Sequence, residues 1–250
     1  MTLLGTGTSV GVPRIACDCA VCTSPDPRNQ RLRCSILMEA PEGSILVDTT
    51  PDLRQQVLRH GLRELDAVLY THAHADHLHG LDDVRCFCFQ RDTPLPCYGD
   101  EATLLRIRHV FDYAFQAPTG SSRPSLELRG IDGPLSLLGL DLEPIPVLHG
   151  HMPILAYRTG GFAYVTDCSA IPPASMEALR GLDVLILDAL RHRQHPTHFS
   201  LSQALKVAVE LAPHRTYFTH IAHDLDHQTT NSHLPPGVEL AYDGLALDVD

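Results

Sequence analysis

The feature that most constrains this chain is a group of four candidate metal ligands within six residues. Residues 72–77 read His-Ala-His-Ala-Asp-His and begin five residues after the start of the apolar run Ala67-Val68-Leu69-Tyr70. Imidazole nitrogens and carboxylate oxygens suit Zn, Mn or Fe better than Ca or Mg. If the apolar run is a strand, His72 and His74 share one face, and the following turn lets Asp76 and His77 reach the other side of the same cavity. One segment can therefore serve two adjacent ions.

A plain solvated turn is the competing interpretation of this segment. It would leave three imidazoles and a carboxylate beside a buried strand without compensation, which is unfavourable. The same arrangement of a polar residue after an apolar run also recurs along the chain, at Asp48, His149, Asp167 and His220. We therefore favour a metal site assembled from several strand ends.

These five ordered motifs resemble the signature of the metallo-β-lactamase superfamily. The resemblance runs from Leu3-Leu4-Gly5-Thr6-Gly7 to Tyr242-Asp243-Gly244, where we expect a C-terminal strand. It implies an α/β fold, a four-layer αββα sandwich in which a single domain, residues 1–250, carries the metals along one edge.

The alternation of strands and helices is read from the sequence itself. Strands are expected at 35–38, 45–47, 67–70, 162–165, 184–187 and 216–219, and helices at 52–60, 101–113 and 201–211. Ser200 and Gln203 form a capping box before the last helix. The Pro-, Gly- and Ser-rich region from about 116 to 133 is the expected junction of two β/α halves.

The resemblance also implies the ligand sets of two divalent ions, Zn or Mn, that hold a hydroxide between them. One ion is expected on His72, His74 and His149, the other on Asp76, His77 and His220, and Asp167 is expected to bridge them. His149 is preferred to His151 because it directly follows its strand. Asp48 is expected to accept a hydrogen bond from a ligand imidazole.

Two of these residues separate the chain from antibiotic hydrolases. Many β-lactamases of the superfamily lack the equivalent of His77 and generally replace Asp167, so phosphodiester hydrolysis is favoured. Asp76, as ligand and catalytic residue, and a histidine of the loop after Leu190 are expected to carry the reaction. That loop holds His192, His195 and His198, and the residue pattern leaves open which of them contacts the substrate.

A second cluster of candidate ligands lies near the N-terminus. Cys17, Cys19 and Cys22 offer three thiolates within six residues, which suits a tetrahedral zinc site with one ligand still to find, although three buried thiols are the alternative. With the spacing from His220 to His223, the cluster resembles PhnP-type cyclic phosphodiesterases of carbon–phosphorus lyase pathways. That resemblance implies His223 as the fourth ligand of a structural zinc, and it matches Pro196-Thr197-His198-Phe199 to a catalytic histidine, His198. An imidazole of ordinary pKa can protonate a leaving alkoxide at neutral pH.

Composition limits the partners. The formal net charge of −11 argues against the basic surface that holds long nucleic acid, but bound cations still allow a small phosphorylated substrate. The sequence has neither a signal-peptide pattern nor 18 consecutive apolar residues, so we expect a cytoplasmic protein that does not engage a membrane. The sequence also allows a homodimer.

Two other functions compete with a phosphodiesterase. Residues 50–56 and the cysteine loop also resemble the pyrroloquinoline-quinone biosynthesis B proteins, but those relatives tend to lose the 72–77 motif that is intact here. A tRNA 3′-processing endonuclease would need a Gly/Lys-rich arm to hold RNA, and the sequence shows none.

Overall fold

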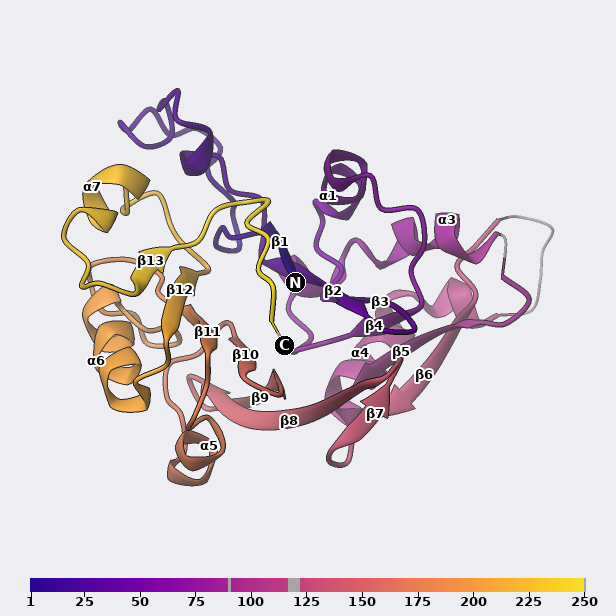
Figure 1. Ribbon diagram of the computed structural model, residues 1–250. Helices are drawn as coiled ribbons and strands as arrows, with labels where there is room; N and C mark the ends of the chain where they lie inside the picture. Colours follow the sequence, from indigo (N-terminus) through magenta and orange to yellow (C-terminus); the bar gives the residue numbers. More distant parts are fainter. Residues whose placement is uncertain (90, 117–121, 250) are drawn as a thin grey trace.

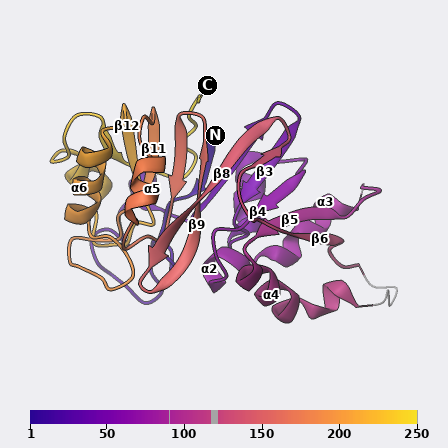
Figure 2. The same cartoon turned by 90° about the horizontal axis from the view of Figure 1, so that it is seen from below.

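The computed structural model describes residues 1–89, 91–116 and 122–249, and two β-sheets packed face to face form its centre (Figure 1). Helices cover the outer face of each sheet, and Figure 2 shows α5 and α6 on one side and α3 and α4 on the other. The predicted αββα sandwich is therefore confirmed.

The N-terminal half forms the first sheet, whose strand order is β1-β2-β3-β4-β5-β6. The strands are β1 (Thr2–Gly5), β2 (Ser35–Ala40), β3 (Gly43–Val47), β4 (Ala67–Leu69), β5 (Leu95–Gly99) and β6 (Leu126–Gly130). β3 to β6 run parallel to one another, so their carboxyl ends meet at one edge. The helices of this half are α1 (Leu53–His60), α2 (Ala75–Leu78), α3 (Arg85–Cys88) and α4 (Glu101–Val110).

The C-terminal half forms the second sheet, in the order β13-β12-β11-β10-β9-β8-β7. Its strands are β7 (Leu135–Leu137), β8 (Leu140–His149), β9 (Met152–Thr159), β10 (Phe162–Val165), β11 (Val184–Asp188), β12 (Arg215–Thr219) and β13 (Val238–Leu240). β10 to β13 are parallel and again end at a common edge. The helices are α5 (Pro173–Ala178), α6 (Leu201–Leu211) and α7 (His227–Asn231).

The alternation of side chains along each strand builds the layers. On β2, Ile36 and Met38 face the other sheet, while Leu37 lies in the cluster beneath the outer helices. On β11, Val184 and Ile186 face inward, and the intervening leucines pack against the helices of the second half. Strands such as β2 and β11 are therefore apolar on both faces, as expected where a sheet is covered on both sides.

The three helices that the sequence predicts correspond to α1, α4 and α6, while the shorter α2, α3, α5 and α7 were not predicted. The Ser200–Gln203 capping box is present, with the Ser200 N–H donating to Gln203 Oε1 at 3.0 Å. Helix α1 ends at His60 and is capped by Gly61, whose φ of 64° is the left-handed conformation that glycine adopts easily. Helix α4 ends at Val110, earlier than the predicted Tyr113, because Phe111 leaves helical geometry and a 3₁₀ turn, Asp112–Phe115, follows.

Two other predictions need correction. Residues 242–244 form a turn and not a strand, because the Asp243 carboxylate accepts from the Thr6 N–H at 2.9 Å and the Leu32 N–H at 2.7 Å, and Gly244 has a φ of 92°. The predicted junction, about 116–133, contains β6 of the first sheet, so the chain passes between the sheets at residues 131–134. Residues 117–121 of that region lie outside the described residues. Within the described part of the chain, the helices are too short or too polar to span a bilayer.

Candidate metal centre

Strand ends of both sheets bring the predicted ligands to one edge of the sandwich. His72 follows β4, His74 caps the short helix α2, and Asp76 and His77 lie on that helix. From the second sheet, His149 is the last residue of β8, and Asp167 and His220 follow β10 and β12. Residues more than 140 positions apart in the sequence therefore share one site because parallel strands end together.

The side chains fall into two adjoining groups. In the first group, His72, His74 and His149 each offer an atom within 4.8 Å of the others. In the second, the same holds for Asp76, His77, Asp167 and His220. These are the residues that the sequence assigns to two ions.

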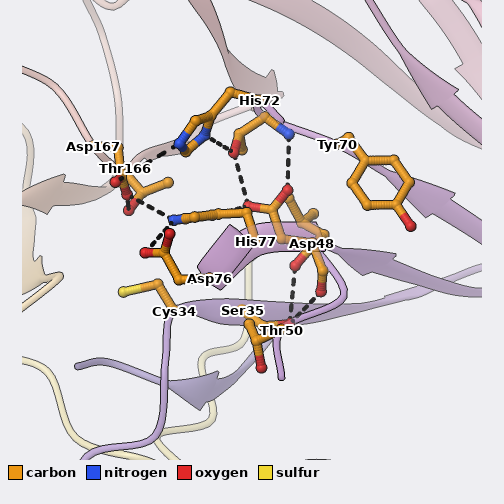
Figure 3. A network of polar contacts seen from close by, with 12 residues as sticks. Cys34, Ser35, Asp48, Thr50, Tyr70, His72, Asp76, His77, Thr166 and Asp167 are labelled. Atoms are coloured by element: carbon orange, nitrogen blue, oxygen red, sulfur yellow. Dashed lines mark hydrogen bonds and ion pairs between the residues drawn. The ribbon is translucent and has the colours of Figure 1, made fainter. Parts of the chain in front are cut away.

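Asp167 lies between the groups. Its Oδ1 is 3.1 Å from His77 Nε2, and its Oδ2 is 3.2 Å from His220 Nε2 and 3.9 Å from His72 Nε2. It thus faces histidines of both groups at once, which is the position that a shared ligand needs. Figure 3 shows it beside His72, His77 and Asp76.

Several buried nitrogens at this place make no hydrogen bond of acceptable geometry among the described residues, although the carboxylates of Asp76 and Asp167 lie nearby. They are His72 Nε2, His77 Nε2 and both ring nitrogens of His220. Leaving such atoms unpaired inside a protein is costly, and a cation is the partner that suits imidazole lone pairs converging with carboxylates. The residues present therefore fit a pair of divalent ions.

The protonation equilibria also favour a cation here. Burial opposes ionisation of Asp167, but His220 and His77 outweigh it and hold the Asp167 pKa well below its usual range. Burial likewise opposes charge on His77, yet Asp167, Asp48 and Asp76 raise the pKa of His77 well above its usual range. Without a metal, a proton on His77 balances the carboxylates, and a bound cation would take over that role.

Asp48 orients His77 from behind, as the sequence predicts. The Asp48 carboxylate is fully buried and accepts from His77 Nδ1 at 2.7 Å, from the Thr71 N–H at 2.8 Å and from Thr71 Oγ1 at 2.8 Å. Burial raises the Asp48 pKa and the neighbouring His77 opposes that rise. Because Nδ1 carries the hydrogen, the His77 lone pair at Nε2 is directed to the ligand group.

His198 lies against both groups, with its ring 4.5 Å from that of His220 and 4.6 Å from that of His149. Its Nδ1 is 2.8 Å from Asp188 Oδ2, which also accepts from the Cys168 N–H at 2.7 Å. Burial, followed by the charge of His220, lowers the His198 pKa to about 3, so the imidazole is neutral in the free protein. Because Asp188 Oδ2 already accepts from the Cys168 N–H, it also faces His198 Nδ1 as an acceptor, and Nε2 is left for the site.

Asp188 contacts the candidate site through His198, although the sequence analysis does not single it out. It is the last residue of β11 and fully buried, and burial raises its pKa well above the usual range. The signal was available, because an aspartate directly after an apolar strand is the same pattern that identified Asp48 and Asp167. Thr197 was missed as well; its carbonyl oxygen accepts from His149 Nδ1 at 2.7 Å, and no sequence motif marks that contact.

The other candidate histidines differ in their exposure and in their distance from the two ligand groups. His151 is exposed in the turn after β8, outside the two ligand groups. In the loop after β11, the His192 side chain is exposed, whereas His195 is half-buried with its ring 5.2 Å from that of His198.

The cysteine cluster is also assembled. Cys17, Cys19, Cys22 and His223 offer atoms that all lie within 4.8 Å of one another. His223 Nδ1 is 3.3 Å from Cys17 Sγ and 3.2 Å from Cys19 Sγ. Hydrogen bonds from the Cys22 N–H and His223 lower the Cys19 pKa to about 6. Three sulfurs and one imidazole nitrogen are a donor set that zinc prefers, so these residues fit a structural zinc.

Comparison with known proteins agrees with this geometry. A family profile described as a beta-lactamase superfamily domain matches residues 44–221. A solved structure of a diphosphatase from the PhnP family superposes with a TM-score of 0.94 at 48% identity, over 100% of this chain and 97% of that chain. Zn²⁺-bound PqqB from Methylobacterium extorquens gives a TM-score of 0.80 at 20% identity over 99% of each chain, which shows a shared fold.

One curated relative is longer than this chain. The octanoyltransferase of Porphyromonas gingivalis is 38% identical over 253 residues, which are 99% of this chain and 51% of the relative. The chain thus spans about half the length of that protein. The family profile covers most of the chain, and the PhnP-family structure matches it from end to end. The chain therefore belongs to the beta-lactamase superfamily and, within it, to the PhnP family of metallo-β-lactamase-fold hydrolases.

Proposed function

We propose that this protein is a dinuclear, metal-dependent phosphodiesterase that hydrolyses a small or cyclic phosphodiester. The observation that carries the proposal is the pair of adjoining ligand groups with Asp167 between them and His198 alongside. The first ion would be held by His72, His74 and His149, and the second by Asp76, His77 and His220, with Asp167 shared. When bound, two divalent ions neutralise charge on a phosphoryl group and supply a nucleophile at neutral pH.

The chain's own residues would orient the reaction. Asp48 and Thr197 accept hydrogen bonds from ligand histidines, which fixes the ring orientation and leaves the other nitrogen to bind. Asp188 holds Nδ1 of His198, so Nε2 meets the substrate. The negative charge of a bound phosphoryl group favours a proton on Nε2, and that proton can pass to the leaving oxygen. Asp76 would orient the attacking water as well as bind metal.

A diphosphate is the second candidate substrate. The PhnP-family relative with 48% identity is a diphosphatase, and a diphosphate is cleaved by the same attack on phosphorus with phosphate as the leaving group. Octanoyl transfer is not proposed, because this chain spans only 51% of the relative of that name. PqqB shares the fold with this chain at 20% identity. The complete ligand set in this chain supports a hydrolytic function rather than the cofactor-synthesis function of PqqB.

We also propose one structural zinc on Cys17, Cys19, Cys22 and His223. His223 lies three residues beyond the ligand His220, and the Ile221 N–H donates to the Thr6 carbonyl at 2.8 Å, so the zinc would tie the N-terminal loop to the segment that carries an active-site ligand. This second role is conformational, with no part in the chemistry.

The test is turnover of a panel of cyclic and linear phosphodiesters and diphosphates by the metal-quantified protein. Asp167→Ala is expected to lower metal content and abolish turnover together, because it removes the shared ligand. His198→Ala is expected to keep both ions and lose turnover by about 10²–10⁴-fold, the range for a general acid or base. His192→Ala, on the same loop with an exposed side chain, is the matched control. Turnover of thioesters or lactams but no phosphorus substrate would refute the proposal.

A further inference from the structure

The loop between β11 and α6 is fixed at both ends. The Leu190 N–H donates to the Phe199 carbonyl and the Leu201 N–H to the Arg191 carbonyl, each at 2.9 Å. The Arg191 guanidinium bonds to carbonyl oxygens within the loop, those of Arg193 at 3.4 Å and Gln194 at 3.3 Å. The histidines on this loop therefore occupy set positions relative to the ligand groups.

Three imidazole rings form a row that leads outward from the second ligand group. The His220 ring lies 4.5 Å from that of His198, which lies 5.2 Å from that of His195. His220 and His198 are buried and His195 is half-buried, so the row runs from the interior to the mouth of the site. The proposed reaction uses the first two rings and leaves His195 without a role.

Hydrogen bonds fix which nitrogen of His195 carries the hydrogen. Its Nδ1 lies 3.4 Å from the Thr197 backbone nitrogen and 3.1 Å from Thr197 Oγ1. A backbone N–H can only donate, so Nδ1 must accept and the hydrogen of the neutral ring is on Nε2. Burial and the neighbouring His198 lower the pKa of His195, which favours the neutral ring. His195 thus presents one N–H donor.

Thr197 links this donor to the ligand groups. Its carbonyl oxygen accepts from His149 Nδ1 at 2.7 Å, while its N–H and Oγ1 contact His195. Gly150, next to His149, makes room for this approach: a Cβ at Gly150 would lie 3.0 Å from Thr197 Cγ2. Thr197 therefore sets the orientation of both the ligand His149 and the outer donor His195.

We propose that the Nε2–H of His195 binds an anionic oxygen of a second phosphoryl group, so that the site discriminates in favour of diphosphates. This inference rests on the proposed function. The leaving group of a diester is an alkoxide or phenoxide with one oxygen beside His198. The leaving group of a diphosphate is a phosphate or phosphate monoester, whose further oxygens would extend toward His195. In the hydrolysis, water forms one P–O bond, the bridging P–O bond breaks, and its electron pair goes to the leaving phosphate. The proton from water is released to solvent or passes through His198, and His195 keeps its own.

The test compares two substrates, diadenosine diphosphate and bis(4-nitrophenyl) phosphate, in the metal-loaded protein. His195→Phe keeps a ring without the donor and is expected to lower kcat/KM on the diphosphate by about 10–100-fold, the worth of a hydrogen bond to a charged group. On the diester the same variant should change kcat/KM by less than about threefold, as expected for a contact that the diester does not make. His195→Gln restores an N–H donor and should recover part of the loss, whereas His192→Ala should match the wild type on both substrates.

The outcomes separate the two proposals. Equal losses on both substrates, or no loss on the diphosphate, would overturn the role of His195 while the phosphodiesterase proposal stands. Wild-type protein that cleaves neither substrate, nor the wider panel of phosphorus esters, would remove the proposed function and this inference with it. Metal content measured for each variant excludes loss of ions as the cause, because a purely structural change at Thr197 or His149 would lower it.

Discussion

Replacing Asp48 tests how the protein prepares a ligand before any metal binds. The residue is fully buried and receives three hydrogen bonds, two from Thr71 and one from His77. In Asp48→Ala all three donors lose their acceptor, and removing one partner of a buried charged pair costs about 3–5 kcal/mol of folding free energy. That variant should therefore be destabilised and poorly metallated together.

Asp48→Asn separates these two effects. Asparagine has the same shape and tolerates the positive φ of 65° at this position. If its NH₂ group faces His77, Nδ1 must become an acceptor and the hydrogen moves to Nε2, which should weaken metal binding by about 10–100-fold. If the amide is flipped, the NH₂ group opposes the Thr71 N–H instead, and the unsatisfied donor should cost about 1–3 kcal/mol of stability.

The assay has two readouts on each purified variant. Denaturant unfolding of the metal-free protein gives the free energy of folding, and calorimetric titration with Zn²⁺ or Mn²⁺ gives the affinity. Thr71→Ser is the control, because it keeps the hydroxyl group that contacts Asp48 Oδ2 at 2.8 Å and the metal ligand His72 at 3.0 Å, and it leaves the acceptor of His77 in place. Asp48→Asn that matches the wild type in both measurements would refute the argument that Asp48 sets the His77 tautomer.

The remaining predictions concern His198 and the cysteine cluster. Asp188→Asn keeps a hydrogen-bond acceptor for His198 but removes the negative charge of the aspartate. Turnover should therefore fall about 10–100-fold while both active-site ions are retained. Loss of an ion in this variant would instead make Asp188 part of the metal site. Cys19→Ser should remove one ion per chain by elemental analysis and lower the melting temperature, and only two ions in reconstituted wild type would contradict the structural zinc. The Cys19 pKa is lowered from about 9, the value of an ordinary thiol, to about 6 in the folded protein. The folded state therefore gains its full stabilisation from this thiolate above about pH 9. It loses that stabilisation as the pH falls through about 6. Denaturant unfolding of the metal-free protein across this pH range should show the acid loss, and Cys19→Ser should lack it.

Several ligands could be found in the sequence because they stand at the end of an apolar strand or within three residues after it. His149 is the last residue of β8, His220 directly follows β12, and His72 lies three residues after β4, so the fold brings them together where the strands end. The same rule applied one strand further would have identified Asp188.

Hydrogen bonds to backbone carbonyl and N–H groups could not be predicted from the sequence in this way. Any residue offers a carbonyl oxygen, so the acceptor role of Thr197 toward His149 depends on the path of a loop 48 positions away. The turn at Asp243 escaped prediction for a similar reason, because the distant Thr6 and Leu32 N–H groups determine it. Local pattern predicts elements and side-chain chemistry, but it contains little about long-range backbone partners.

Three residues of the centre have a backbone conformation that strand patterns do not predict. Asp48, Asp167 and His220 have φ values of 65°, 55° and 57°, which are uncommon outside glycine. Each of the three lies one or two residues after the end of a strand. Its left-handed conformation interrupts the alternation of side chains between the two faces of the sheet and turns the side chain along the sheet edge. Such a conformation costs on the order of 1–3 kcal/mol and persists only where its surroundings fix it. Here the Asp48 N–H donates to the Leu69 carbonyl at 2.9 Å and the His220 N–H to Cys34 Sγ at 3.2 Å. The sheet therefore holds ligand and supporting residues in place before the cations arrive, and metal binding need not supply the free energy of forming these turns.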